Sequence, residues 1–506
     1  MDNKDQSLVI RRGWYELAPL YSRFMSGSPI SLSEGSLFLI EESYHYLRDK
    51  ALKDSDAYYG INTGFGSLCD VKIRVDELEE LQYNLLRSHA CGTGDTVPRE
   101  IVRMMLLLKV MSLSQGYSGV SAELINRLIH FYNNNIVPVI YEYGSLGASG
   151  DLAPLAHLAL PLIGEGEVWK ENSITKTEET DIGAIELGPK SGLALINGTQ
   201  FSTAYTYCSV MEGKRLLEWA VMISAISCDA FGCLRTPFDD RIHRIRQQKG
   251  QRLIASRILE LLSDSELTSI SGSSVQDPYS FRCTPQVLGA SWDALMYAWE
   301  IVEREVNAVT DNPNIFSDSD GILTGGNFHA QPIAIVADYL AIALAEVASI
   351  SERRLYQLLS GNRDLPDYLI DDAGYQSGMM IVQYSAASVV SHNKQLCTPS
   401  VVDSIVSSQG QEDHVSMAAN AAVKLYKVVG NLRRVLAMEL IAASQAIDFR
   451  KPLKPNERLQ HLHASFRERV PFLDKDREMH VDIRRAIDFI SENAPDIDLG
   501  QPDIQG

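Results

Sequence analysis

Cysteine and positive charge are both scarce in this 506-residue sequence, and each scarcity excludes a class of protein. The seven cysteines are scattered, odd in number and never spaced as CxxC. We therefore expect neither a disulfide framework nor a thiolate metal site, and a reducing cytoplasm fits best. The histidines form no HExxH motif, so no metal site is predicted. The formal net charge of −19 argues against nucleic acid as a partner, because an acidic surface repels phosphates.

Long apolar runs are missing as well. The N-terminal residues Met1–Asp5 are polar and acidic, and no apolar core of a signal peptide follows them. The most apolar stretches are Met104–Val110 and Leu152–Ile163. Both are far shorter than the roughly 20 residues of a membrane-spanning helix, so no membrane partner is expected.

Helical periodicity is the main pattern that the sequence does contain. Apolar residues make up 45% of the chain, which is enough for a large core. Shorter helices are predicted in the first part of the chain, at 34–48, 75–87, 98–115 and 122–133. Longer ones are predicted after residue 200, at 201–226, 285–309, 331–360 and 416–446.

These patterns predict a mainly α protein, with a long-helix bundle and a smaller N-terminal domain. We divide the chain into an N-terminal domain at 1–200 and a helical bundle domain at 201–506, within one continuous unit. Helices of this length usually need partners along their whole surface, which points toward oligomerisation.

The stretch Gly144–Gly150 is dense in glycine and precedes an apolar helix. One interpretation is structural: a loop that caps the helix, with Ser149 or Asp151 as the N-cap. The other is chemical. The amide nitrogen of Gly150 can attack the carbonyl carbon of Ala148 and close a five-membered ring around Ser149. Glycine suits the attacking position because it has no Cβ.

Loss of water from that ring, and of the hydroxyl from Ser149, would leave an exocyclic methylidene. The product is 4-methylidene-imidazol-5-one, an electrophile that no standard side chain provides. It suits the removal of ammonia from an amino acid, where the leaving group is poor and the β-hydrogen is barely acidic. Each tenfold gain in rate requires about 1.4 kcal/mol of barrier reduction. The poor leaving group and the weakly acidic β-hydrogen are two coupled problems of this kind, which explains why an unusual cofactor would be useful.

The Ala148-Ser149-Gly150 stretch resembles the cofactor-forming motif of the aromatic amino acid lyase family, the methylidene-imidazolone ammonia-lyases. The resemblance runs from about Leu32 to about Phe449. It implies a mainly α fold and autocatalytic formation of the cofactor from these three residues. It also implies a small amino-acid substrate and a homotetramer, with each active site assembled from three subunits.

Further segments carry the resemblance to particular residues. Tyr59 begins the family's tyrosine loop, which implies a general base or proton relay. His89 matches a position that faces the substrate side chain, and Asn197 one that holds the cofactor and the substrate carboxylate. The structural alternatives are a tyrosine packed in a glycine-rich loop, a satisfied histidine at a helix end, and a helix N-cap.

The segment from Gln276 to Cys283 is dense in polar groups and also matches the family. Gln276 is assigned to substrate binding. Tyr279 and Arg282 are three residues apart, so they share a face if the segment is helical. Arg282 offers a planar fork for a carboxylate, and Tyr279 could assist proton transfer. A buried salt bridge is the alternative for Arg282. Phe328 is expected to pack against the cofactor ring.

Glu412 discriminates best between substrates. The stretch Gln411-Glu412-Asp413-His414 resembles the histidine-specific members, whereas phenylalanine and tyrosine lyases typically carry an amide at this position. A carboxylate could accept a hydrogen bond from an imidazole N–H or act as a base. The structural alternative is a helix N-terminus, where the dipole favours acidic residues.

Together these residues favour L-histidine as substrate, with trans-urocanate and ammonia as products. A tyrosine or phenylalanine ammonia-lyase and a 2,3-aminomutase with the same cofactor remain open alternatives. Another class is a catalytically silent helical scaffold like the fumarase and aspartase group. That group carries a mobile serine loop with methionine and lysine nearby, and no such segment occurs in this sequence.

Overall fold

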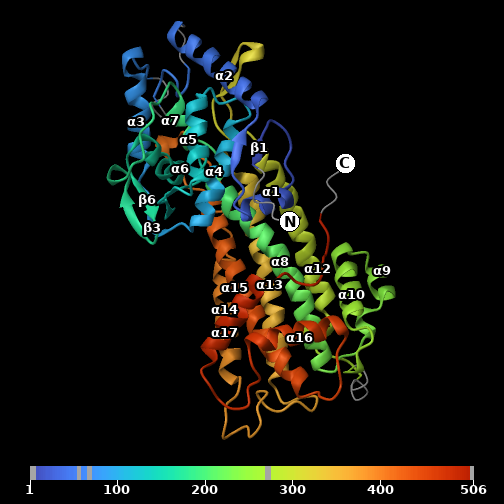
Figure 1. Ribbon diagram of the computed structural model, residues 1–506. Coiled ribbons are helices and arrows are strands. Elements are labelled where there is room, and N and C mark those ends of the chain that lie inside the picture. The colour runs from blue at the N-terminus through green and yellow to red at the C-terminus, as the bar shows by residue number, and fades with distance from the viewer. Residues whose placement is uncertain (1–6, 54–57, 65, 67–70, 268–274, 502–506) are drawn as a thin grey trace. The chain divides into compact units, whose positions relative to one another are not determined.

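The chain is mainly helical in the computed structural model, as the sequence predicts (Figure 1). The structure describes residues 7–53, 58–64, 66, 71–267 and 275–501. The chain forms two compact units, and both are discontinuous in sequence. Met1–Cys208, Trp299–Asp338 and Pro399–Val423 form the first unit, and the remaining segments form the second. A division into domains at residue 200 stays a prediction, because compactness does not show which parts fold separately.

Short helices make up most of the first unit: α1 (Leu17–Met25), α2 (Glu34–Lys53), α3 (Leu78–His89), α4 (Arg99–Leu113), α5 (Ala122–Asn133), α6 (Leu152–Ala159) and α7 (Ser191–Ile196). The four helices predicted in this part of the sequence correspond to α2, α3, α4 and α5. The start of α5 agrees with its prediction because Ser121 caps it, with its hydroxyl accepting a hydrogen bond from the amide of Leu124 at 3.3 Å.

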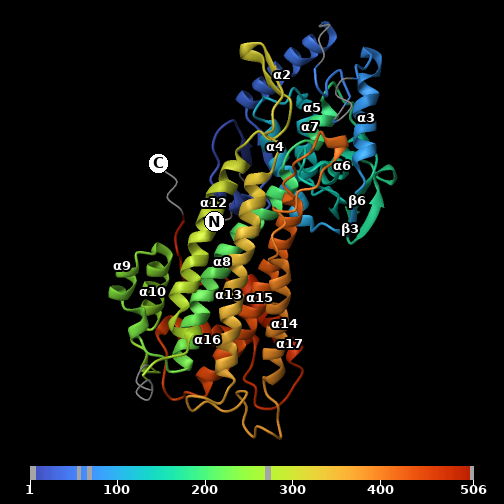
Figure 2. The ribbon, with the colours of Figure 1, turned by 180° about the vertical axis from the view of Figure 1, so that it is seen from behind.

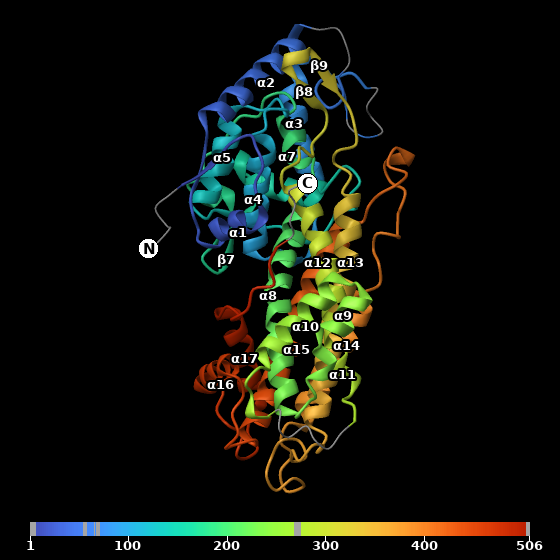
Figure 3. The same cartoon turned by 90° about the vertical axis from the view of Figure 1, so that its right-hand side faces the viewer.

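Small sheets join these helices. Strand β1 (Leu8–Ile10) pairs in parallel with β2 (Ile30–Leu32), and β3 (Thr93–Thr96) pairs antiparallel with β5 (Tyr141–Tyr143). A third sheet has the order β4 (Val137–Pro138), β6 (Glu167–Lys170) and β7 (Ser173–Lys176). The hairpin of β8 (Asn314–Phe316) and β9 (Gly321–Leu323) lies against α2 (Figure 3).

Helix α4 forms the centre of the first unit. Every residue from Met104 to Leu113 is buried, including Lys109, and α5 packs against α4. The run Met104–Val110, which is among the most apolar of the sequence, therefore lies in a core helix.

Long helices supply most of the second unit: α8 (Gln200–Ala230), α12 (Thr284–Val306), α13 (Gln331–Leu358), α14 (Met380–Leu396) and α15 (Ala418–Asp448). The shorter α9 (Asp240–Arg246), α10 (Lys249–Leu261), α11 (Tyr279–Arg282), α16 (Glu457–Arg469) and α17 (Met479–Glu492) complete it. Within this unit α8, α13 and α15 run side by side (Figure 2). The predicted long helices agree with α8, α12, α13 and α15 to within four residues at each end.

A buried ion pair joins these helices inside the second unit. Arg354 on α13 donates to both oxygens of Glu439 on α15, at 2.6 and 2.9 Å, and both side chains are fully buried. Ser227 on α8 and Ser351 donate to the same carboxylate. Because both charges are paired and hydrogen-bonded, the core tolerates them.

Helix α13 is also the most apolar long helix among the described residues. Its most apolar 18-residue window has a mean hydropathy of 2.0, so the helix is long and apolar enough to cross a membrane. However, 61% of that window is buried inside the protein. A core helix passes the same test of length and composition, so the observation is weak evidence for a membrane. The sequence pattern predicted this segment as a helix, but the expectation that no apolar stretch is long enough to cross a membrane is wrong for α13, where Asp338 and Glu346 interrupt an otherwise apolar run.

Candidate active site

The loop before α6 is held in a conformation that only glycine accepts at residue 150. Gly150 has φ +79°, in the left-handed region that disfavours other residues. A Cβ at this position would overlap the carbonyl oxygen of Gly198. The amide of Asp151 donates to that same oxygen at 2.7 Å. Two backbone segments thus approach each other closely, and the absence of a side chain on Gly150 permits it.

Asp151 anchors the loop through buried hydrogen bonds. Its buried carboxylate accepts hydrogen bonds from the Ser145 hydroxyl at 2.8 Å and from the amide and hydroxyl of Ser202 at 2.9 and 2.8 Å. Burial raises the pKa of Asp151, and these hydrogen bonds oppose the shift. Asp151 stands at the N-cap position of α6 but makes no capping hydrogen bond. The interpretation of Asp151 as a side-chain cap is therefore wrong, because Ser145 and Ser202 occupy its carboxylate.

Ser149 is held between an amide and a carboxylate. Its hydroxyl donates to Oε1 of Glu412 at 3.0 Å, and its carbonyl oxygen accepts from Nδ2 of Asn197 at 3.1 Å. The other oxygen of Glu412 accepts from the Ser407 hydroxyl at 2.7 Å. Ser407 was not among the residues singled out from the sequence, because nothing in its neighbourhood marks it before the chain is folded.

The structural alternatives for Asn197 and Glu412 are both wrong in their details. Asn197 is the C-cap of α7, where its amide donates to Leu193, and not the N-cap of the next helix. Glu412 lies in a turn, and the helix that follows begins only at Ala418. Neither side chain is used to satisfy a helix N-terminus, so both remain available to Ser149.

Two adjoining cavities of the first unit meet at Ser149. The polar residues that line the larger cavity, of about 580 Å³, include Tyr59, Ser88, His89, Ser149, Asn197 and Glu412. The smaller, of about 400 Å³, is lined by Tyr59, Ala148, Ser149, Phe328 and Glu412, together with His329 and His414. Ser149, Glu412 and Tyr59 line both cavities, so the glycine loop presents its serine to a space that a small molecule could enter.

His89 and Tyr59 contribute the remaining polar groups of the larger cavity. His89 is the last residue of α3, and its Nδ1 lies 3.0 Å from the Ser88 hydroxyl. Burial lowers the pKa of His89, while the carboxylate of Glu412 acts in the opposite direction. Burial thus favours the neutral imidazole, which has one donor and one acceptor nitrogen. The Tyr59 hydroxyl accepts from the amide of Gly66 at 3.1 Å.

The smaller cavity contains a histidine pair that the sequence did not suggest. The rings of His329 and His414 stack with centroids 5.6 Å apart. His414 stands in the Glu412 turn, and His329 follows Phe328 directly. The adjacency of each histidine to an assigned residue was the only available signal.

Three of the predicted site residues belong to the second unit. Arg282 lies over the ring of Tyr279, with its guanidinium carbon 4.5 Å from the centroid, which confirms that the two share a helix face. Tyr279 is 71% exposed and lines a separate cavity of about 490 Å³. Gln276 is exposed. Arg282 makes no salt bridge with the described residues. That these three residues bind the same substrate as Ser149 stays a prediction.

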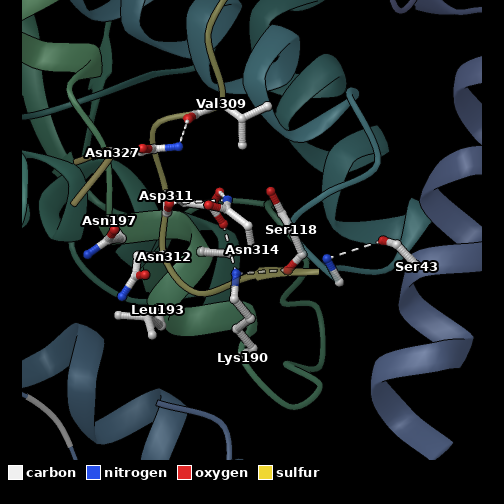
Figure 4. Close-up of polar contacts among 12 residues, drawn as sticks. Ser43, Ser118, Lys190, Leu193, Asn197, Val309, Asp311, Asn312, Asn314 and Asn327 are labelled. Carbon is white, nitrogen blue, oxygen red and sulfur yellow. Dashed lines mark hydrogen bonds and ion pairs between the residues drawn. The ribbon is translucent and has the colours of Figure 1, made fainter. Parts of the chain in front are cut away.

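A buried charge cluster lies beside Asn197 in the first unit. Lys190 donates to Asp311 at 2.7 Å and to the main-chain carbonyl of Ser118 at 2.9 Å (Figure 4). Both charged side chains are almost fully buried. Asn314 adds a longer hydrogen bond to Asp311 at 3.3 Å. This cluster fixes the loop that leads to the β8–β9 hairpin against the start of α7.

The residues around the tripeptide fit a ring formed from its own backbone. The attacking residue, Gly150, has no room for a side chain, and Ala148 is buried. Oδ1 of Asn197 is buried and has no hydrogen-bond partner among the described residues. An orphaned acceptor of this kind, beside a cavity, is what a bound ligand would satisfy. By contrast, no group of three or more potential metal-binding side chains occurs in the described part of the chain. The six cysteines described are free, and Cys69 lies outside the described residues.

The long-helix fold and the loop that presents Ser149 agree with a carbon–nitrogen lyase, the class to which the similar proteins belong. Residues 17–468 match the family model of the aromatic amino acid lyases. A histidine ammonia-lyase of Pseudoalteromonas atlantica is 45% identical over 94% of this chain and 95% of its own length.

Solved structures agree with this match. A histidine ammonia-lyase from Trypanosoma cruzi has a TM-score of 0.88 and 36% identity over 96% of this chain and 94% of its own. A phenylalanine aminomutase from Pantoea agglomerans has a TM-score of 0.91 and 29% identity over 97% of this chain and 100% of its own. The chain belongs to the aromatic amino acid lyase family.

Proposed function

We propose that the protein eliminates ammonia from L-histidine to give trans-urocanate at the cavity around Ser149. The observation that carries this proposal is that a carboxylate, Glu412, and an imidazole, His89, line that cavity together. An imidazole side chain can donate to the first and exchange a hydrogen bond with the second. An unsubstituted phenyl ring could offer this half-buried carboxylate no hydrogen bond, so such a substrate would desolvate it without compensation. The histidine ammonia-lyases among the curated relatives support the same substrate.

The proposed electrophile is 4-methylidene-imidazol-5-one, formed autocatalytically from Ala148-Ser149-Gly150. When present, it supplies an electron-poor carbon that turns the amino group of the substrate into a better leaving group. The side chains that would hold it are Asn197, which donates to the Ser149 carbonyl, and Phe328, which lines the cavity beside Ala148. This assignment is supported by the left-handed conformation of Gly150 and by its contact with Gly198.

Each remaining residue receives a role from its position. The Tyr59 hydroxyl, at the junction of the two cavities, is proposed to hold or move a proton. Glu412 and His89 orient the imidazole of the substrate. The unpaired Oδ1 of Asn197 is suited to accept from the substrate amine or from a protonated carboxyl group.

We further propose a cytoplasmic homotetramer in which residues of neighbouring subunits complete each site. Arg282 would pair with the substrate carboxylate through its planar fork. Tyr279, held beneath that guanidinium, and Gln276 would contact the substrate amine. The high exposure of Tyr279 supports a role for this surface in association with another copy.

Product analysis with three substrates tests the proposal. Purified protein is supplied separately with L-histidine, L-tyrosine and L-phenylalanine, and the ultraviolet absorbance of the conjugated acid is followed. We expect urocanate from histidine only. Coumarate or cinnamate without urocanate would assign the protein to the tyrosine or phenylalanine lyases. A β-amino acid as the main product would identify an aminomutase.

A further inference from the structure

Lys109 is a buried cation whose ammonium group contacts the main-chain carbonyl of Asn197. It lies on α4 in an otherwise apolar run and is 1% exposed. Its ammonium donates to the carbonyl oxygens of Asn197 at 2.8 Å and Ala194 at 3.2 Å. It forms no salt bridge with the described residues, whereas the equally buried Lys190 is paired with Asp311.

Stability alone does not account for an ammonium in this place. Burial lowers the pKa of Lys109 to about 7, and Lys190 shifts it further in the same direction, while Asp311 and Asp151 oppose the shift. A methionine would fill the same space without the cost of burying a charge, and such replacements are often neutral or stabilising. The two carbonyls that Lys109 binds lie at the C-terminal end of α7, where carbonyls lack N–H partners within the helix.

The hydrogen bonds of Lys109 lead directly to the proposed reaction centre. Asn197 is fixed on one side by its amide, which donates to Leu193 at 2.8 Å, and on the other by Lys109 at its carbonyl oxygen. The side chain between these fixed points donates to the carbonyl oxygen of Ser149. Closing the ring removes the oxygen of Ala148 and the hydroxyl of Ser149 as two waters. The carbonyl oxygen of Ser149 is retained, so the acceptor of Asn197 is not lost in cyclisation.

We propose that Lys109 is a positioning residue of the active site, which acts by fixing the main chain of Asn197 so that its amide stays directed at the carbonyl oxygen of Ser149. The inference rests on the proposed function, because it concerns the same site. Lys109 touches no reacting atom and works only through Asn197.

A double-mutant cycle tests this role, since a residue that acts only through Asn197 has no effect once the Asn197 amide is gone. Four proteins are compared: wild type, Lys109→Met, Asn197→Ala and the double variant. The kcat is measured per chain that has lost two waters, as determined by intact mass. We expect Lys109→Met to lower kcat on the order of 10- to 100-fold, as for a charged hydrogen bond, with KM changed less than about threefold. The double variant is expected to match Asn197→Ala.

The double replacement Lys190→Met with Asp311→Asn is the matched control, because it removes an equally buried ammonium together with the charge of its carboxylate partner. Its effect on kcat should be small and should add to that of Asn197→Ala. Additive losses for Lys109→Met and Asn197→Ala would overturn the proposal and make Lys109 a structural residue. If Lys109→Met does not fold, the same cycle is run with Lys109→Leu, which also removes the donor, and the same additivity decides.

Failure of the proposed function gives a different result. If the wild type releases no ammonia from histidine but does so from another amino acid, the substrate assignment fails and the cycle is measured with that amino acid. If no amino acid reacts, the rate of water loss after synthesis, read by intact mass, replaces kcat. Coupled effects of the two substitutions on that rate would support the positioning role, and additive effects would refute it.

Discussion

Replacing Glu412 by glutamine separates the charge of this side chain from its shape. In the present structure one oxygen of Glu412 accepts from Ser149 and the other from Ser407. Glutamine keeps one acceptor, and the Ser407 hydroxyl can rotate to accept from the new amide, so we expect stability to change by less than about 1 kcal/mol. The proposed cofactor formation would remove the Ser149 hydroxyl and so free the first oxygen for the imidazole N–H of the substrate.

The expected loss follows from the strength of that bond. A hydrogen bond to a charged group contributes about 1.5–3 kcal/mol, which corresponds to roughly 10- to 150-fold in kcat/KM. Initial rates of urocanate formation in Glu412→Gln and wild type measure it, and thermal unfolding checks that the variant is folded. Ser407→Ala serves as the control, since it keeps the carboxylate and removes one supporting bond; its loss should stay below about tenfold. A fall of less than threefold in Glu412→Gln would refute the assignment of Glu412 to the substrate.

Further predictions concern the glycine loop and the buried charges. Gly150→Ala should prevent the loss of two waters, seen by intact mass, because a Cβ overlaps Gly198; Gly35→Ala, whose Cβ meets nothing within 4 Å, should still lose both waters. Arg354→Met should destabilise the protein by about 3–5 kcal/mol in thermal or denaturant unfolding, because Glu439 stays buried without its partner. The double replacement Arg354→Met with Glu439→Leu should recover most of that loss, and no recovery would contradict the pairing argument. Burial lowers the pKa of Lys109 from its ordinary 10.5 to about 7, so between these values the unfolded chain binds more protons than the folded one. The stability of wild type relative to Lys109→Met should therefore rise with pH in this window, by at most about 1.4 kcal/mol per pH unit, and a flat difference would show that Lys109 titrates normally.

Periodicity was sufficient to predict the long helices. Helix α5 matches its predicted range because Ser121 supplies a local cap, and α13 and α15 match because their apolar residues recur over many turns. Helical periodicity does not predict how the chain divides into compact units. Residues 299–338 and 399–423 join the first unit through tertiary contacts between segments far apart in sequence, which no local signal records.

Some site residues can be predicted from local motifs, whereas others are revealed only by tertiary contacts. Motifs identified Ser149, Asn197 and Glu412, and the structure brings these three together through hydrogen bonds. Ser407 reaches Glu412 only because a turn folds back between them. Lys109 left one signal, a single charge within the apolar run Met104–Val110, but its partner at Asn197 is more than eighty residues away in sequence.

The second group of predicted residues illustrates a different limit. Tyr279 and Arg282 contact each other as their spacing predicts, since both lie on α11. Local spacing reveals that pair, but it does not reveal which other groups face them. Their role in substrate binding therefore stays a prediction that depends on association with other copies of the chain.

The most direct test of the central proposal compares wild type with Ser149→Ala on L-histidine while the absorbance of urocanate is followed. We expect wild type to release urocanate and ammonia in equal amounts. We expect Ser149→Ala to remain folded, to keep the mass of the unmodified chain and to form no urocanate. Urocanate formation by folded Ser149→Ala at a rate near that of wild type would refute the proposed role of Ser149.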